Sequence, residues 1–394
     1  MSTKGGKAMT EFLTGVNGNM IRWAREFYNM TSEDAAQAIG VDISRYNSWE
    51  SGTEYPTYSK LKKISAVFRK PSAVFFFPEP PELPKIKGDL RTLPTEVVNT
   101  FSKQIIMQFE KGKVYQLSLQ ELYDGKNSII SRKNSFPTEI KSLCEFFRKE
   151  LQFPISAQKA RKSTKVVFEI FRERFYDLGI YVFKDAFRDD SISGLCLYDE
   201  TYPVILINNS MSFARQIFTL FHELYHLISS TSGAEIIRDD FYVSLDNEQS
   251  EIEHECDSFA NAFLIPIDDF VIELNKRNLD EERIEELSNL YSVSKEAIMY
   301  KLYKMGRITS DEYNNLKEFF YGEAIRNPEK KKSKSSGGNH YYTHISYLGQ
   351  RYTGDVFKQY FSGKIDSVRA SEMLHSKVDH LPTLETVYFR GIGK

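Results

Sequence analysis

The segment from Phe218 to Ile228 places two histidines and a glutamate inside an otherwise apolar stretch. Residues four apart lie on the same face of an α-helix, so His222 and His226 can converge on one cation while Glu223 flanks its open coordination position. Burying these side chains without a partner would be costly, and the apolar neighbours are typical of a buried helix. The segment therefore predicts a hydrolytic zinc site on a helix covered by a sheet. A histidine pair that meets on a helix by chance is the alternative.

A third ligand must come from elsewhere, because a catalytic zinc usually takes three protein ligands and leaves the fourth place to water. Residues 247–266 carry apolar residues at helical spacing and end at a proline, which predicts a second helix. Glu253 and Asp257 stand four residues apart on it, so Glu253 can bind the metal while Asp257 accepts the second N–H of a ligating histidine. His254 and Glu255 compete for the ligand position, and a helix so rich in acids could also be solvated on that side.

The Glu-x-x-x-Asp spacing resembles the second zinc helix of thermolysin-like enzymes. More widely, residues 203–226 and 253–266 resemble ImmA/IrrE-type metallopeptidases, and the resemblance extends over about residues 165–325. The sequence departs from that family at Tyr225, where Gly is common, and at Cys256-Asp257, where Ala-Asn is common. Neither departure removes a presumed ligand, although Tyr225 could narrow the cleft and the cysteine could be sensitive to oxidation.

This resemblance implies a zincin-like domain with the activity of a zinc endopeptidase. Zinc would lower the pKa of a bound water molecule and polarise the scissile carbonyl, while Glu223 would take the proton of that water and return it to the leaving amine. Asp257 would orient an imidazole. Relatives with this catalytic pattern cut a partner transcriptional repressor, so the implied substrate is a regulatory protein.

Residues 15–82 contain a second pattern, in which two short helices are joined by a glycine turn after an amphipathic first helix. Thr31 or Ser32 can cap the earlier of the two helices, Gly40 can make the turn, and Asp42 can cap the later one. This is the spacing of a helix-turn-helix. The predicted core of the domain is Ala36, Ile39, Trp49 and Leu61.

The run from Gly40 to Gly52 resembles the Xre/Cro repressor family, in which the second helix of the motif enters the major groove. The resemblance implies DNA contacts by the side chains at the start of that helix, which are Ile43, Ser44, Arg45 and Asn47. Residues 1–77 hold ten Lys or Arg and seven Asp or Glu, a modest excess for a phosphate-binding surface. A helical module that binds protein instead of DNA therefore stays open.

The remaining segments predict an α+β, mostly α architecture. Residues 83–160 are expected to form a connector and a helical scaffold, and residues 161–325 the peptidase-like domain. Helical spacing extends over 95–123 and 137–178, and strands are predicted at 180–183, 194–197 and 204–207. A small sheet should therefore lie under the zinc helices.

Residues 287–306 suggest another helix-turn-helix, whose Lys295, Lys301 and Lys304 could meet nucleic acid, although such lysines more often form a solvated face. A polar linker is predicted at 326–339. Residues 340–394 then form a small C-terminal unit without a recognised family, and docking to another chain would explain its aromatic residues.

The net charge of −2 gives no general basic field, so any DNA contact must rest on a local surface. Three widely separated cysteines, Cys144, Cys196 and Cys256, favour a reducing cytoplasm over a disulfide framework. No run of about 18 apolar residues predicts a membrane span.

Together these features predict a cytoplasmic zinc endopeptidase joined to a DNA-binding module, which cleaves or controls a regulatory protein such as a repressor. The alternative is the antitoxin of a toxin–antitoxin pair, which binds DNA through its first domain and a toxin through its C-terminal unit. In that case the zinc domain would be structural or active only conditionally. A homodimer is compatible with either function.

Overall fold

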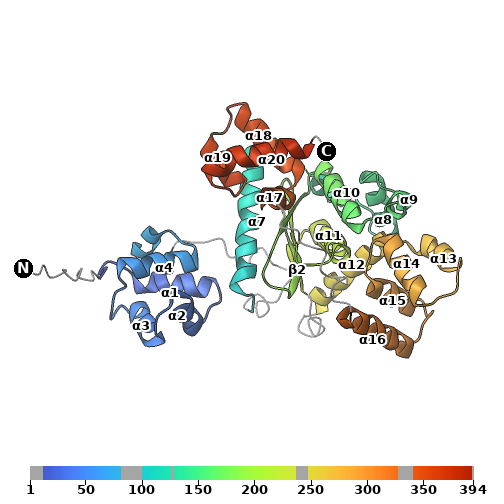
Figure 1. Cartoon of the computed structure of the whole chain (residues 1–394), viewed down its shortest axis with the longest axis horizontal. Coiled ribbons are helices and arrows are strands. Elements are labelled where there is room, and N and C mark those ends of the chain that lie inside the picture. Colours follow the sequence, from blue (N-terminus) through green and yellow to red (C-terminus); the bar gives the residue numbers. More distant parts are fainter. Residues whose placement is uncertain (1–11, 81–99, 126–127, 237–246, 327–339, 393–394) are drawn as a thin grey trace, which may run out of the picture. The chain divides into compact units, whose positions relative to one another are not determined.

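The computed structural model describes residues 12–80, 100–125, 128–236, 247–326 and 340–392 (Figure 1). Contacts divide the chain into two units, residues 1–88 with 95–107 and residues 89–94 with 108–394. Helices dominate the described residues, and a four-stranded sheet lies in the second unit, which confirms the α+β, mostly α prediction. Among the described residues no helix is both long and apolar enough to cross a membrane.

The first unit consists of four α-helices and a short 3-10 helix among the described residues, and the caps predicted for α2 and α3 lie at the ends of those helices. They are α1 (Gly18–Phe27), α2 (Ser32–Ile39), α3 (Ile43–Glu50), α4 (Tyr58–Phe68) and the short 3-10 helix η1 (Ser72–Phe76). Thr31 caps α2 and exchanges hydrogen bonds with Asp34, and Gly40 ends this helix in the left-handed region with a φ of 73°. Asp42 is the N-cap residue of α3, although its side chain makes no capping hydrogen bond.

A buried ion pair orients α3 against α1. Arg25 donates from Nε and Nη2 to the two carboxylate oxygens of Glu50, at 2.7 and 3.1 Å. The two helices also touch at Gly18, where a Cβ atom would overlap the carbonyl oxygens of Trp49 and Glu50. All four predicted core residues of this domain are buried. The opposite face of α3 is consequently left exposed.

The sheet of the second unit has the strand order β1-β3-β2-β4. Its strands are β1 (Tyr181–Asp185), β2 (Ile192–Leu197), β3 (Val204–Asn208) and β4 (Gly233–Ile236). β1 pairs with β3 in parallel, whereas β2 pairs antiparallel with both β3 and β4. The first three strands lie at the predicted positions, and the fourth was not predicted.

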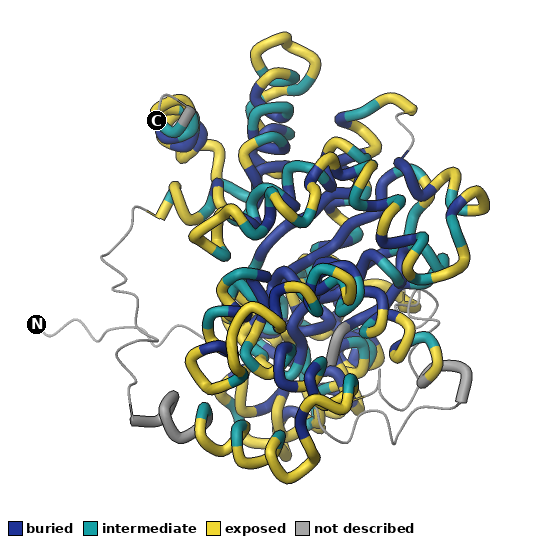
Figure 2. Tube along the Cα trace, turned by 90° about the vertical axis from the view of Figure 1, so that its right-hand side faces the viewer, coloured by how far each residue is buried: buried dark blue, intermediate teal, exposed yellow. Residues whose placement is uncertain are grey.

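Both faces of the sheet are covered, and β1, β2 and β3 are almost continuously buried (Figure 2). On one face Ile205 and Ile207 join the core formed with α11 (Phe213–Ile228) and α12 (Asn247–Leu264). On the other face the ring of Tyr115, on α7 (Lys103–Leu122), stacks on Phe183 with centroids 3.7 Å apart. The alternation of strand side chains therefore supplies two apolar surfaces, one for each helical layer.

The scaffold helices are shorter than the sequence predicted. The predicted helix at 137–178 is interrupted, because Gln152 has a φ of 48° and Phe153 precedes a proline, which disfavours helical backbone. The predicted helix at 95–123 begins at Lys103, and residues 95–99 and 327–339 lie outside the described part of the chain. The observed helices in this region are η2 (Ile129–Ser135), α8 (Ile140–Glu150), α9 (Ile155–Lys159) and α10 (Thr164–Asp177).

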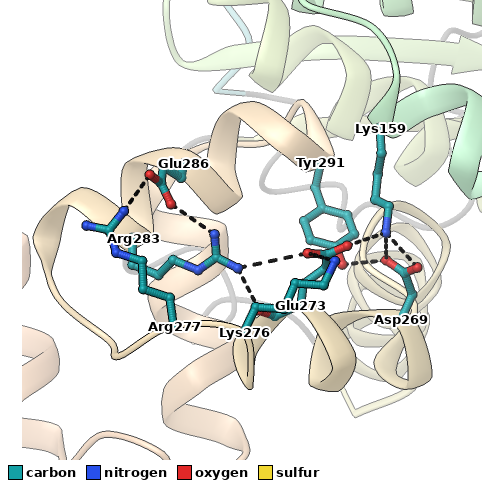
Figure 3. A network of polar contacts seen from close by, with 8 residues as sticks. All are labelled: Lys159, Asp269, Glu273, Lys276, Arg277, Arg283, Glu286 and Tyr291. Carbon is teal, nitrogen blue, oxygen red and sulfur yellow. Dashed lines mark hydrogen bonds and ion pairs between the residues drawn. The ribbon is translucent and has the colours of Figure 1, made fainter.

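Four helices follow α12, namely α13 (Ile267–Leu274), α14 (Glu281–Tyr291), α15 (Lys295–Lys304) and α16 (Ser310–Arg326). A network of charges joins the first two of them to α9 (Figure 3). Lys159 of α9 reaches Asp269 at 2.8 Å and Glu273 at 2.7 Å on α13, and Arg283 of α14 donates to the Glu273 carbonyl oxygen at 2.6 Å. The network thus holds α14, the first helix of the suggested second helix-turn-helix, and Lys295 of α15 pairs with Glu285 of α14 at 2.8 Å.

The C-terminal helices pack on the sheet layer of the same chain. They are α17 (His340–Leu348), α18 (Gln350–Phe361), α19 (Ser367–Met373), the 3-10 helix η5 (Val378–His380) and α20 (Leu381–Ile392). Tyr352 packs edge-on against Tyr115 and Phe183. Arg172 of α10 donates to the carbonyl oxygens of Ser346 and Tyr347 at 2.6 and 2.7 Å. Much of the aromatic content of this unit is therefore used within the chain, and another chain is not needed to explain it.

Acid pH should weaken this packing through His375. Burial, followed by the charges of Lys111 and His344, lowers the pKa of His375 from 6.5 to about 4 against an opposing effect of Asp185. The folded chain then binds fewer protons than the unfolded chain, so stability falls as the pH drops from 6.5 towards 4. The loss is at most about 3 kcal/mol.

Denaturant unfolding of the full chain at about pH 7 and about pH 5 measures this loss. The variant His375→Asn cannot titrate, and Asn tolerates the φ of 47° at this position. It should show a smaller pH dependence than the wild type. An identical pH dependence in both proteins would contradict the assignment to His375.

Candidate functional site

Helices α11 and α12 bring three electron-rich side chains to one point. The Nε2 atoms of His222 and His226 are 3.3 Å apart. The carboxylate oxygens of Glu253 lie 3.2 Å from His222 Nε2 and 3.4 Å from His226 Nε2. A tetrahedral zinc ion with bonds of about 2.0–2.1 Å separates its ligands by about 3.3–3.4 Å. The spacing of the three side chains thus matches one coordination sphere, and each is at most 1% exposed.

The outer nitrogens of both imidazoles have partners that require a proton on Nδ1. Asp257 Oδ1 lies 3.0 Å from Nδ1 of His222. Thr231 Oγ1 lies 3.2 Å from Nδ1 of His226 and donates its own proton to the His226 carbonyl oxygen. In neutral imidazoles the two Nε2 atoms then carry lone pairs that face each other and the carboxylate of Glu253. A cation at this point removes that repulsion, so these residues fit a zinc ion.

The electrostatics of Glu253 agree with a cation site. Burial would raise the pKa of Glu253, but the neighbouring His226 and His222 outweigh it and hold the pKa well below its usual range. The Oε1 atom of Glu253 accepts no hydrogen bond within the described part of the chain. Glu253 is therefore an ionised carboxylate whose two oxygens face the two imidazoles.

Glu223 stands between His222 and His226 in the sequence of α11, and its side chain is fully buried. The carboxylate of Glu223 lies next to the thiol of Cys196 on β2. Burial of this thiol, and then the charge and hydrogen bonding of Glu223, raise the pKa of Cys196 well above its usual range. Glu223 is absent from the convergent set of His222, His226 and Glu253. Burial, and then the charges of Glu253 and Glu223, raise the pKa of Cys256, so both carboxylates lie near this thiol. Glu223 is therefore a candidate general base near the proposed ligands.

The competing sequence candidates on α12 point elsewhere. His254 and Glu255 are exposed, and Glu255 accepts a hydrogen bond from Tyr225 at 3.0 Å. Cys256 is fully buried, and its sulfur lies within 4.8 Å of a nitrogen of both His222 and His226. Two side chains of α12 that can donate electrons to a metal, Glu253 and Cys256, therefore lie near both histidines.

Sequence reasoning missed two residues that shape this site. Thr231 follows the end of α11, where no spacing rule connects it with His226. Gly233 begins β4, and a Cβ atom there would lie 2.6 Å from Cδ2 of His226. Glycine therefore allows the edge strand to approach the imidazole. A single glycine in a sequence does not predict such a contact.

A cavity of about 720 Å³ adjoins the outer side of the site. Its lining includes Phe218 and Asp257 near His222, together with Arg215, Tyr300 and Lys301. Lys301 donates to the Ile265 carbonyl oxygen at 2.6 Å, and burial lowers its pKa to about 8. The prediction of a solvated lysine face is therefore wrong for Lys301.

The four predicted DNA-contacting residues all lie on the exposed face of α3, whereas Tyr46 and Trp49 are buried. Arg45 lies 3.9 Å from Glu54. Burial, followed by the charges of Lys63 and Arg45, lowers the pKa of Lys60, so these three cations share one surface. Sequence reasoning missed Lys60 and Lys63 because they belong to α4 rather than to the helix-turn-helix.

Comparison with protein families confirms both recognised domains. Residues 176–303 match the family model of the IrrE N-terminal-like domain, a peptidase family M78 model, and residues 21–75 match a helix-turn-helix model. One similar solved structure is a Mycobacterium tuberculosis transcriptional regulator, with 18% identity and a TM-score of 0.29, covering 48% of this chain and 51% of that chain. The chain thus spans about half the length of that regulator. The search of curated proteins found no match.

Proposed function

We propose that this chain, which carries a helix-turn-helix domain before an IrrE-like peptidase domain, is a zinc-dependent endopeptidase that cleaves or controls a regulatory protein such as a repressor. The observation that carries the proposal is the convergence of His222, His226 and Glu253, whose coordinating atoms lie 3.2 to 3.4 Å apart. The buried carboxylate of Glu223 beside them supplies the group that hydrolysis needs.

Each residue has a defined task in the proposed reaction. Zinc bound here would lower the pKa of a water molecule and polarise the substrate carbonyl. Asp257 and Thr231 accept the Nδ1 protons and so keep the Nε2 atoms of His222 and His226 available as ligands. Glu223 accepts a proton from the attacking water and passes it to the leaving amine.

The cavity beside α11 and α12 is the proposed place for part of the substrate peptide. Its lining includes Asp257, the partner of His222, and the aromatic residues Phe218 and Tyr300. Aromatic walls of this kind can pack a peptide side chain, and a cavity of about 720 Å³ has room for more than one residue.

Zinc-dependent cleavage tests the function. The full chain with one equivalent of zinc should cleave members of a mixed peptide library, and mass spectrometry of the products identifies the cut positions. A chelator should abolish the cleavage and added zinc should restore it, because only the metal can lower the pKa of the water and polarise the substrate carbonyl. Cleavage that persists in the chelator would mean a different mechanism. Zinc-loaded protein that cleaves no peptide, both as wild type and as Cys256→Ala, would count against a peptidase.

The first domain is proposed to bind DNA through Ile43, Ser44, Arg45 and Asn47. Binding of the full chain to selected duplexes should weaken steeply as salt rises, because lysines and arginines displace counterions from phosphate. The double variant Arg45→Ala, Asn47→Ala should lose about 1–3 kcal/mol of discrimination for each base contact removed. Arg161→Ala, at an exposed arginine of the second unit, is the matched control. Absence of any sequence preference in the wild type would favour the protein-docking alternative.

One observation favours the antitoxin alternative. Phe361 on α18 and Phe389 on α20 are 53% and 52% exposed, and their ring centroids lie 6.3 Å apart. Two large exposed aromatic residues side by side are typical of a surface that contacts a protein partner. In that case the metal would serve folding and the C-terminal helices would hold the toxin.

A further inference from the structure

Cys256 lies on the same face of α12 as Glu253, which is three residues before it. Its side chain is fully buried, and its sulfur is within 4.8 Å of a nitrogen of both histidines. The metal ligand proposed on this helix and the thiol thus point into one region from a single helical turn.

A thiolate is a good zinc ligand, with a bond of about 2.3 Å. In a tetrahedral site this bond length places sulfur about 3.6 Å from a nitrogen ligand. The sulfur lies within 4.8 Å of these nitrogens, so it must move toward them by about 1 Å at most to reach this distance. A small rotation of the cysteine side chain supplies that movement. The buried carboxylate of Glu253 lies 3.2 and 3.4 Å from the same two Nε2 atoms, so two anionic groups of α12 face this pair of nitrogens.

We propose that Cys256 is a fourth protein donor to the metal held by His222, His226 and Glu253. The inference rests on the proposed metal site but not on peptidase activity. Catalytic zinc sites keep one position open, whereas sites with four protein ligands are closed. With the thiolate bound, the position that hydrolysis needs is filled by sulfur, and Glu223 has no water to deprotonate. The thiol loses its proton to solvent when it binds, and it must leave the metal before substrate can be cut.

Cobalt(II) in place of zinc reports this ligand directly, because a thiolate bound to cobalt absorbs strongly in the near ultraviolet. The cobalt-loaded full chain should show this charge-transfer band. Cys256→Ala should lose the band but keep the weaker visible bands of cobalt held by the other three ligands. Cys144→Ala and Cys196→Ala are matched controls, since both thiols are buried, and each should keep the band.

The possible outcomes separate this inference from the proposed function. Cobalt binding without a charge-transfer band in the wild type, or a band that survives in Cys256→Ala, overturns the thiolate ligand and leaves the three-ligand site standing. Failure of the wild type to bind cobalt or zinc overturns both. If the thiolate blocks the open position, Cys256→Ala should also cleave peptides faster than the wild type, and an unchanged rate would contradict the closed state.

Discussion

Replacing Glu223 by glutamine should leave the metal and the fold in place and reduce peptide cleavage by about 10²-fold or more. Glu223 is fully buried, and its carboxylate is not one of the groups of His222, His226 and Glu253 whose atoms lie 3.2 to 3.4 Å apart. Glutamine has nearly the same shape but cannot accept the proton of the attacking water. The loss should therefore appear in kcat, with metal content and thermal unfolding close to those of the wild type.

Glu255→Gln is the matched control for this variant, because Glu255 is an exposed acid on α12 that contacts Tyr225. It removes one negative charge near the site without touching the proposed chemistry, so its cleavage rate should stay near that of the wild type. Equal biological activity of the wild type and Glu223→Gln in cells would sink the peptidase function. The antitoxin function, with zinc as a folding ligand, would then be the better account.

Replacing either His222 or His226 by alanine should reduce the metal content from about one zinc per chain to near zero. Each imidazole is one of the proposed ligands. The Nδ1 partners Asp257 and Thr231 hold the two rings in place, so the remaining histidine cannot supply the missing nitrogen. Metal binding adds to folding free energy, and the variants should therefore also unfold at lower temperature than the zinc-loaded wild type. Metal analysis after gel filtration measures the first effect, and calorimetry measures the second.

The two acids of α12 provide the sharpest comparison within this prediction. Glu253→Gln should weaken zinc retention far more than Glu255→Gln, because only Glu253 lies within 3.4 Å of both imidazoles. Full zinc occupancy in a histidine variant would end the site assignment. A greater loss in Glu255→Gln than in Glu253→Gln would move the third ligand by two residues along the helix.

Local patterns determined much of this chain. The pair His222 and His226 follows from helical geometry alone, since residues four apart share a face in any α-helix. The capping at Thr31 and the turn at Gly40 are likewise local, because each depends on the backbone preference of one residue. These features could be predicted because the atoms involved belong to neighbouring residues.

Only the tertiary structure decided which residue of α12 meets the histidines. Spacing left Glu253, His254 and Glu255 as candidates for the third ligand, and the packing of α12 on α11 turns Glu253 inward while the other two are exposed. The stacking of Phe221 on Phe263, with centroids 4.0 Å apart, fixes that rotation of the helix. A helix shows its own periodicity in sequence, but the direction of its buried face at one turn depends on its neighbour.

Tertiary packing also decided which residues surround His226 and where the C-terminal helices lie. Thr231 and Gly233 reach His226 because β4 pairs with β2, and the C-terminal helices cover the second face of the sheet through Tyr352 and Arg172. The contacts of the C-terminal helices join residues far apart in the chain, and Thr231 and Gly233 meet His226 because the chain turns back after α11, so no helical spacing predicts either kind of contact. Helical faces and caps depend on neighbouring residues and can be predicted from the sequence. A coordination sphere also depends on the packing of strands and helices against one another, which only the tertiary structure shows.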